Sequence, residues 1–193
     1  MSPRLAPYVV NLFSNFSGMP NLIGPIDPRL VSTGQVFVAN QMRTCRVVVP
    51  KDGEIRDVSV WIVAQSGNIA LAVYDTNDAS AGNRTQLWSS GSVACGGATA
   101  WQTIDPGAGT VKVKAGQLLD FAVVADNATA SIGRTATFAS GINQLPTNFA
   151  IAPGGASPKV ATTVATAFPP PSTIAEASLV ANNNVPVIIA RIA

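Results

Sequence analysis

The chain has 193 residues, of which 47% are hydrophobic and only 11% are Asp, Glu, Lys or Arg, and its formal net charge is +2. A chain of this length can bury about 70% of its extended surface, so one substantial core is expected. The small net charge and the single, scattered Lys and Arg residues argue against electrostatic binding of nucleic acid.

The low share of charged residues is itself informative, because soluble domains carry about 25%. Such a surface is rich in Ser, Thr, Asn and Gly, or is covered by neighbouring subunits. We interpret the deficit as a sign of assembly.

No stretch approaches the roughly 20 consecutive apolar residues of a membrane span. Arg4 precedes an apolar run from Leu5 to Phe13, but Pro7 and Asn11 interrupt this run and no small-residue cleavage site follows it. We therefore expect a chain without a secretory signal that is made and folded in the cytoplasm.

The first 34 residues predict an extended, proline-rich arm. Each proline removes a backbone donor and disrupts a helix, yet the segment is too apolar for a solvated tail. We expect the arm over residues 1–34 to pack against its own domain or a neighbour. The prolines are Pro3, Pro7, Pro20, Pro25 and Pro28.

From residue 35 to residue 193 the sequence predicts a single β-sandwich domain. Short runs rich in β-branched residues recur about every 8–12 residues and are separated by Gly, Asn and Asp, with almost no helical periodicity. This spacing is typical of an all-β, antiparallel sandwich. The strands are expected at 35–40, 43–50, 55–63, 69–75, 85–94, 100–105, 131–139 and 186–192, with two more paired around Gly116.

Two details of this domain can be tested against the structure. Gly53 lies in a turn over residues 51–54 and is expected at positive φ. Residues 141–184 contain many prolines and predict a long loop insertion, in which residues 173–180 are compatible with two helical turns.

The chain offers no recognisable reaction chemistry. It has no histidine, and no serine lies in a G-x-S-x-G context that would supply a nucleophile with a base. The acids fall mostly in turns and at strand ends, where such side chains usually bond their own backbone. We expect no catalytic residue, no cofactor and no enzymatic activity.

One loop is a weak candidate for a metal site. Asp75, Asn77 and Asp78 place three oxygen-bearing side chains within four residues, and calcium takes six to eight oxygen ligands. The spaced acidic pattern of a dedicated site is missing, so an ordinary turn is the favoured interpretation.

The two cysteines, Cys45 and Cys95, lie 50 positions apart. A disulfide between them would stabilise the fold by about 4 kcal/mol in the chain-entropy model. The alternative is two buried thiols that act as small hydrophobes, and cytoplasmic synthesis favours this alternative.

Tryptophans offer a candidate ligand surface. Trp88 and Trp101 border the Gly-rich segment 91–98 and could stack on sugar rings. Trp61 lies inside an apolar strand and is expected in the core.

Six short motifs follow one another between residues 41 and 127, at residues 42–50, 53–61, 67–75, 87–91, 101–104 and 113–122. Their order resembles the jelly-roll-like β-sandwich domains of tailed-bacteriophage virion proteins, of the tail-tip, fibre and head-decoration types. The closing strand at 186–191 is similar to the last strand of such domains.

The resemblance implies a non-enzymatic virion component, made in the host cytoplasm, that acts by packing against other virion proteins as a homo-oligomer, with a trimer expected. The competing hypothesis is a module that binds a host cell-surface glycan through Trp88, Trp101 and the loop 77–84. Fold-level resemblance carries function only weakly, so both hypotheses stay open at this point.

Overall fold

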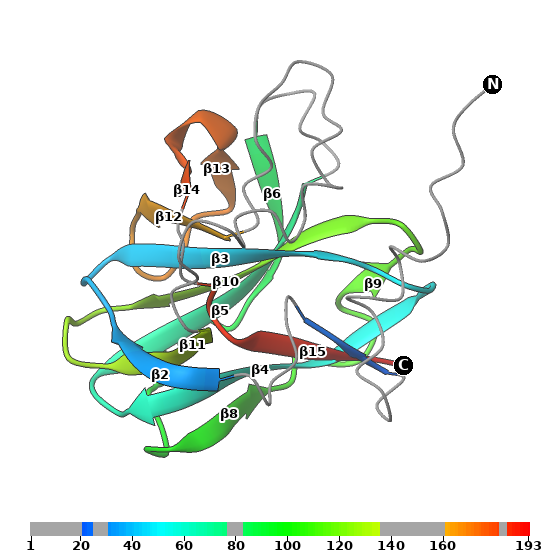
Figure 1. The fold of residues 1–193 in the computed structure, drawn as a ribbon. Helices are drawn as coiled ribbons and strands as arrows, with labels where there is room; N and C mark the ends of the chain where they lie inside the picture. The colour runs from blue at the N-terminus through cyan, green and yellow to red at the C-terminus, as the bar shows by residue number, and fades with distance from the viewer. Residues whose placement is uncertain (1–20, 25–30, 77–82, 136–160, 182–184) are drawn as a thin grey trace.

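The computed structural model describes residues 21–24, 31–76, 83–135, 161–181 and 185–193. These residues form two antiparallel β-sheets packed face to face, which confirms the expected all-β sandwich (Figure 1). In this part of the chain the one helical element is the 3₁₀ turn η4 (Glu176–Ser178). The jelly-roll connectivity implied by the resemblance stays a prediction.

The first sheet, called here the β4 sheet, is built around the longest strand. Its order is β1-β15-β4-β11-β2, and β8 and β9 also pair with β4. The strands are β1 (Leu22–Ile23), β2 (Val31–Val36), β4 (Gly53–Ala64), β8 (Ala100–Ile104), β9 (Lys112–Val113), β11 (Ser131–Thr135) and β15 (Ile188–Ile192).

The second sheet, called here the β10 sheet, has the order β13-β6-β5-β10-β3-β12-β14, and β7 pairs with β5. Its strands are β3 (Gln41–Val48), β5 (Asn68–Asp75), β6 (Asn83–Ser89), β7 (Val93–Ala94), β10 (Leu118–Ala125), β12 (Ala161–Ala165), β13 (Thr173–Ala175) and β14 (Val180–Ala181). The single strand expected at 85–94 is divided into β6 and β7, with Gly91 at a φ of +63° between them.

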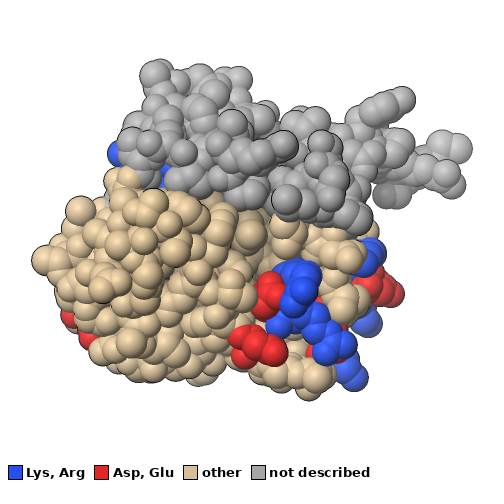
Figure 2. Space-filling model, turned by 90° about the horizontal axis from the view of Figure 1, so that it is seen from below, with Lys and Arg blue, Asp and Glu red and all other residues tan. Residues whose placement is uncertain are grey.

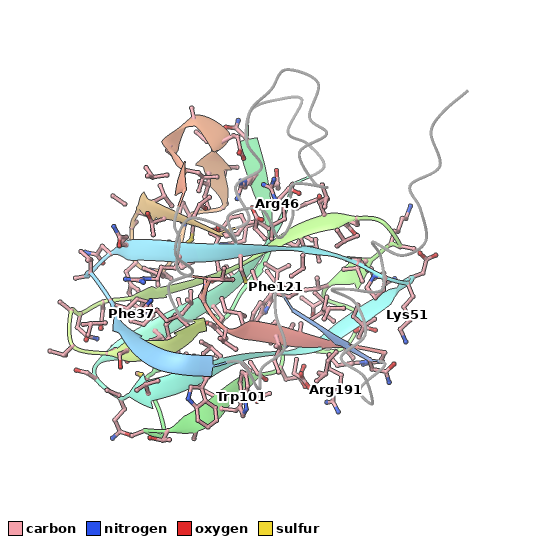
Figure 3. The ribbon with its side chains drawn as sticks, viewed as in Figure 1. Phe37, Arg46, Lys51, Trp101, Phe121 and Arg191 are labelled. Atoms are coloured by element: carbon pink, nitrogen blue, oxygen red, sulfur yellow. The ribbon has the colours of Figure 1, made fainter. Side chains whose placement is uncertain are left out.

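The main core lies between the sheets and follows from the period-two alternation of strand residues. Leu119, Phe121 and Val123 of β10 face inward together with Val58 and Val60 of β4, and all five are fully buried. Figure 3 shows Phe121 in the layer between the two sheets. Apolar side chains at every second position therefore build one continuous core.

A second core covers the outer face of the β10 sheet. Residues 161–181, called here the strap, run from β12 beside β3, past β13 beside β6, and return to β14 beside β12 (Figure 1). The strap buries the strand residues that point away from the main core. This second cluster comprises Met42, Ala70, Ala72, Tyr74, Ala122, Val124, Val164, Ile174 and Leu179.

The structure changes the predicted arm over residues 1–34 in two places. Residues 22–23 pack against their own domain, one of the two expected outcomes, but they do so as strand β1, which pairs with β15, and Ile23 is 1% exposed within the main core. Residues 31–34 belong to β2, so the strand expected at 35–40 begins four residues earlier. Residues 1–20 and 25–30 lie outside the described residues.

The predicted loop insertion at 141–184 is also wrong over its second half, because residues 161–181 form the strap. Residues 141–160 and 182–184 lie outside the described residues. Residues 173–180, whose sequence is compatible with two helical turns, instead form β13, one 3₁₀ turn and the start of β14. Pairing of β13 with the edge of β6 supplies backbone partners that a short isolated helix lacks.

The structure corrects two predictions about glycines: the pairing of the strands around Gly116 and the positive φ of Gly53. The strands on either side of Gly116 do not pair with each other: β9 pairs with β4, and β10 pairs with β3 and β5. Gly116, at a φ of +81°, turns the chain from one sheet into the other.

Gly53 is not among the glycines with positive φ. It is needed for space, because a Cβ there would lie 2.5 Å from the Ala193 carbonyl oxygen and 2.5 Å from Ile192 Cγ2.

This close approach gives a first prediction. Gly53→Ala should lower the free energy of unfolding by about 1–3 kcal/mol, because the carbonyl of the last residue must shift. The matched control is Gly96→Ala, where a Cβ meets nothing within 4 Å. Urea denaturation of both variants checks the prediction, and an equal loss in the two would contradict it.

Candidate functional site

Charge is distributed unevenly over the molecule. Seen from the outer side of the β4 sheet, charged side chains gather mainly at one end, and most of the remaining face is uncharged (Figure 2). We call this group the charged end. It includes Asp52, Glu54, Lys112 and Lys114, which line one hollow, together with the ion pairs Arg56–Glu54 and Arg191–Asp57.

Charges of opposite sign neutralise one another at the charged end. Arg191 Nη2 lies 2.6 Å from Asp57 Oδ2, and Arg56 Nη2 lies 3.5 Å from Glu54 Oε2. A shallow hollow here is lined by both acids and lysines, Glu54 and Lys112 among them. The mixed signs give no concentrated field for an anion or a cation.

The structure separates the two tryptophans proposed for ligand stacking. Trp88 lies on β6 and packs against the main core. Trp101 lies on β8 of the other sheet and is 36% exposed. The predicted Trp88–Trp101 surface is therefore not formed.

Trp101 instead packs against Trp61, a residue that was expected in the core. Trp61 of β4 is its cross-strand neighbour, and the two rings meet edge to face with centroids 5.4 Å apart and planes at 71°. Trp61 is half-buried rather than enclosed. Its neighbours Val60 and Ile62 point inward and are fully buried, so the alternation within β4 could have placed Trp61 on the outer face.

The tryptophan pair belongs to a strip of three residue pairs on the outer face of the β4 sheet, called here the Trp strip. Next to Trp61–Trp101 comes Ser59–Thr103, whose hydroxyls are hydrogen-bonded at 2.8 Å. The third pair is the ion pair of Asp57 with Arg191 of β15. The complete strip consists of Trp61, Trp101, Ser59, Thr103, Asp57 and Arg191.

A buried ion network lies on the opposite side of the molecule, beneath the strap. Asp120 of β10 and Arg84 of β6 are each 1% exposed, and Arg84 Nη1 contacts Asp120 Oδ2. Arg46 of β3 lies beside them, its Nε 3.1 Å from Asp120 Oδ1. Arg84 Nε also donates to Glu176 of the strap at 2.7 Å. Two positive and two negative groups thus neutralise one another inside the fold.

Burial of this network alters its titration. Burial lowers the pKa of Arg84 to about 10, although its hydrogen bond to Glu176 acts in the opposite direction. The guanidinium therefore stays charged at neutral pH, and Asp120 is the counter-charge that it needs.

Neutral hydrogen bonds hold the proline-rich part of the strap. Tyr74 of β5 donates its hydroxyl to the Pro171 carbonyl oxygen at 2.7 Å. Gln86 of β6 donates to the carbonyl oxygens of Pro170 and Pro171 and to the Tyr74 hydroxyl. Burial raises the pKa of Tyr74 to about 12, and the bond from Gln86 opposes this rise.

An exposed apolar corner joins β2 to β3. Val36 and Val38 are 54% and 56% exposed, whereas Phe37 between them is 2% exposed. Arg43 lies over the Phe37 ring, 5.7 Å from its centroid, and donates to the Val36 carbonyl oxygen at 2.8 Å. Phe37 and Arg43 thus anchor the two exposed valines, which we call the valine corner.

Of the three weak metal candidates, the structure describes Asp75 alone. Asp75 ends β5 and accepts a hydrogen bond from Gln117 at 3.0 Å, and Asn77 and Asp78 lie outside the described residues. Within the described ranges, no group of three or more His, Cys, Asp or Glu residues is placed to hold a metal ion.

Cys45 and Cys95 are buried, separate thiols, so the disulfide alternative is not formed. Burial raises the pKa of the Cys45 thiol. A neutral thiol is a poor nucleophile, and Cys45 acts as a small hydrophobe in the main core.

A second prediction concerns the buried network. Asp120→Asn should lower the free energy of unfolding by about 3–5 kcal/mol, because it leaves buried arginines without their counter-charge. The exposed pair offers the control: Arg56→Gln should cost about 0–1 kcal/mol. Chemical denaturation measures both.

A double variant separates charge from packing. Asp120→Asn combined with Arg84→Met should be more stable than Asp120→Asn alone, since the uncompensated charge is gone. This account of the network would be contradicted if the double variant lost as much free energy of unfolding as the two single variants added together.

A third prediction concerns Tyr74. In a Tyr8→Phe background Tyr74 is the one remaining tyrosine, and its phenolate absorbance should appear near pH 12 in the folded protein. Since the folded pKa is raised, the stability linked to this phenol is complete below about pH 10 and is lost as the pH rises past about 12. In denaturant the same tyrosine should titrate near pH 10, and a native titration at that lower value would contradict the burial of Tyr74.

Searches against protein-family models and against curated proteins gave no match to this chain. No helix in the described ranges is long and apolar enough to cross a membrane.

Proposed function

We propose that this chain is a non-enzymatic structural subunit of a bacteriophage virion, of the tail, fibre or capsid-decoration type, that acts by packing against other subunits. The sequence resemblance between residues 41 and 127 supports the virion assignment, and the two-sheet fold is compatible with it. The site of action is then the particle, after synthesis in the host cytoplasm.

The observation that carries the packing proposal is the valine corner. Two large aliphatic side chains are more than half exposed, and they are held in place by a buried phenylalanine and an arginine. An anchored apolar surface loses little conformational entropy when a partner covers it. A neighbouring subunit is the partner that would remove these valines from water.

The low charge of the chain supports the same proposal. Only 11% of residues are charged, and the network of Asp120, Arg84, Arg46 and Glu176 takes four of them largely out of the surface. Interfaces are depleted in Lys, Glu and Asp at their centres. The uncharged faces are therefore suited to contact with other subunits, in a homo-oligomer that we propose to be a trimer.

A fourth prediction tests packing at the valine corner. Val38→Glu should shift the full chain from an oligomer to a smaller species, because a carboxylate would be buried in the contact without a partner. Native mass spectrometry over a range of concentrations measures the shift, and circular dichroism verifies that the variant is folded.

The matched control is Ala98→Glu, which adds the same charge at an exposed position between β7 and β8. This variant should keep the mass of the unmodified chain. A chain that is monomeric at every concentration, or a Val38→Glu variant with unchanged mass, would contradict the proposal.

A further inference from the structure

The geometry points to a binding site for a neutral oligosaccharide on the Trp strip. The oligosaccharide would lie along β4, with one sugar ring against Trp101. Hydroxyl groups elsewhere on the oligosaccharide would contact Thr103 and the Asp57–Arg191 pair. This site differs from the Trp88–Trp101 surface expected from the sequence, and it is distinct from the packing role proposed for the valine corner.

The aromatic end of the strip is both exposed and fixed. Trp101 is 36% exposed. Trp61 packs against it edge to face, at a centroid separation of 5.4 Å. Aromatic pairs prefer this arrangement, which restrains both rings. A restrained, open indole face suits the apolar face of a pyranose and loses little entropy on binding.

The polar part of the strip lies one step along the strand from the aromatic pair. Residues two apart on a strand lie about 7 Å from each other on the same face. Thr103 is exposed, and its hydroxyl shares a hydrogen bond with Ser59. Since either oxygen can be the donor, Thr103 can give or accept a hydrogen bond to a ligand hydroxyl. The strip therefore presents an aromatic ring at Trp101 and a hydroxyl at Thr103, two residues further along β8.

The balanced charges of the Trp strip favour a neutral ligand. The Trp61–Trp101 and Ser59–Thr103 pairs contain no charged group, and the ion pair at the end of the strip is already neutralised at 2.6 Å. Arg191 is 59% exposed on its side chain, so its remaining donors are open to ligand hydroxyls. Because Asp57 neutralises Arg191, the strip carries no net charge that would attract an anionic sugar more strongly than a neutral one. Figure 3 shows Trp101 and Arg191 on the same side of the β4 sheet.

The Trp strip also differs from an aromatic pair whose only role is to stabilise the sheet. Such a pair stabilises by contact between its own side chains, and this requires neither an exposed ring nor an exposed hydroxyl beside it. Val63, the next outward residue of β4, packs against Gly34 of β2.

An array of immobilised neutral oligosaccharides, built from hexoses and N-acetylhexosamines with α and β linkages, tests the inference on the full chain. We expect retention on at least one of these glycans. Trp101→Ala and Trp61→Ala should each weaken that binding by about tenfold or more, through loss of the stacking surface or of its support. Trp101→Phe should retain part of the affinity.

The matched control is Val180→Ala, which truncates a side chain that is 64% exposed in the strap and should leave glycan binding unchanged. Thermal unfolding of each variant separates lost binding from lost folding. Failure of every glycan to bind at millimolar concentration, or undiminished binding by Trp101→Ala, would overturn the inference. So would a Trp101→Ala variant that only changes the oligomeric mass, because the strip would then be a contact between subunits. The valine-corner variants report separately on packing.

Discussion

Burial of β5 and β10 on both faces is the constraint on which the other features of this fold depend. Nearly every residue of these two neighbouring strands is buried. One face of each strand contributes to the core between the sheets. The other face would expose Val124 and three alanines to water if residues 161–181 did not cover it. The strap is therefore part of the hydrophobic core and not an appendage.

Covering this outer face also removes charge from the surface. Asp120 lies in the middle of β10, and a buried carboxylate is costly unless it is paired and hydrogen-bonded. Arg46 of the neighbouring strand β3 and Arg84 of β6, on the far side of β5, supply two positive charges, and Glu176 on the strap completes the network. Sheet and strap thus meet through a neutral set of ions, and a large part of the remaining charge is left at one end of the molecule (Figure 2). The uncharged surface available for contact is a consequence of this arrangement.

The fold class could be predicted from the sequence because it depends on local patterns. β-branched runs, turn residues and period-two alternation located β3, β4, β5, β8 and β15 to within a few residues. The unbroken apolar runs at 69–74 and 121–125 carried a further signal that was missed. Such runs are typical of strands buried on both faces, and they could have indicated that a cover for the β10 sheet was needed.

The errors have a common physical cause, which is that pairing between distant segments decides local structure. Ile23 forms a strand because the edge of β15 accepts it, and residues 173–175 form a strand because β6 does. Gly53 resembles a turn glycine, but the approach of the C-terminal residue determines its role. The same limit applies to the Trp strip, since the pairing of Trp61 with Trp101 depends on the register between β4 and β8, which neither strand specifies alone.

Hydrogen exchange of the native protein, followed by mass spectrometry of peptides, tests the central claim about the strap most directly. If the strap completes the core of the β10 sheet, backbone amides of β12 and β13 should exchange only through the same global opening as those of β5 and β10. Equal protection across these strands is the predicted result. Exchange of residues 161–181 within seconds, with β10 still protected, would contradict the account, because the outer face of that sheet would then be stable without its cover.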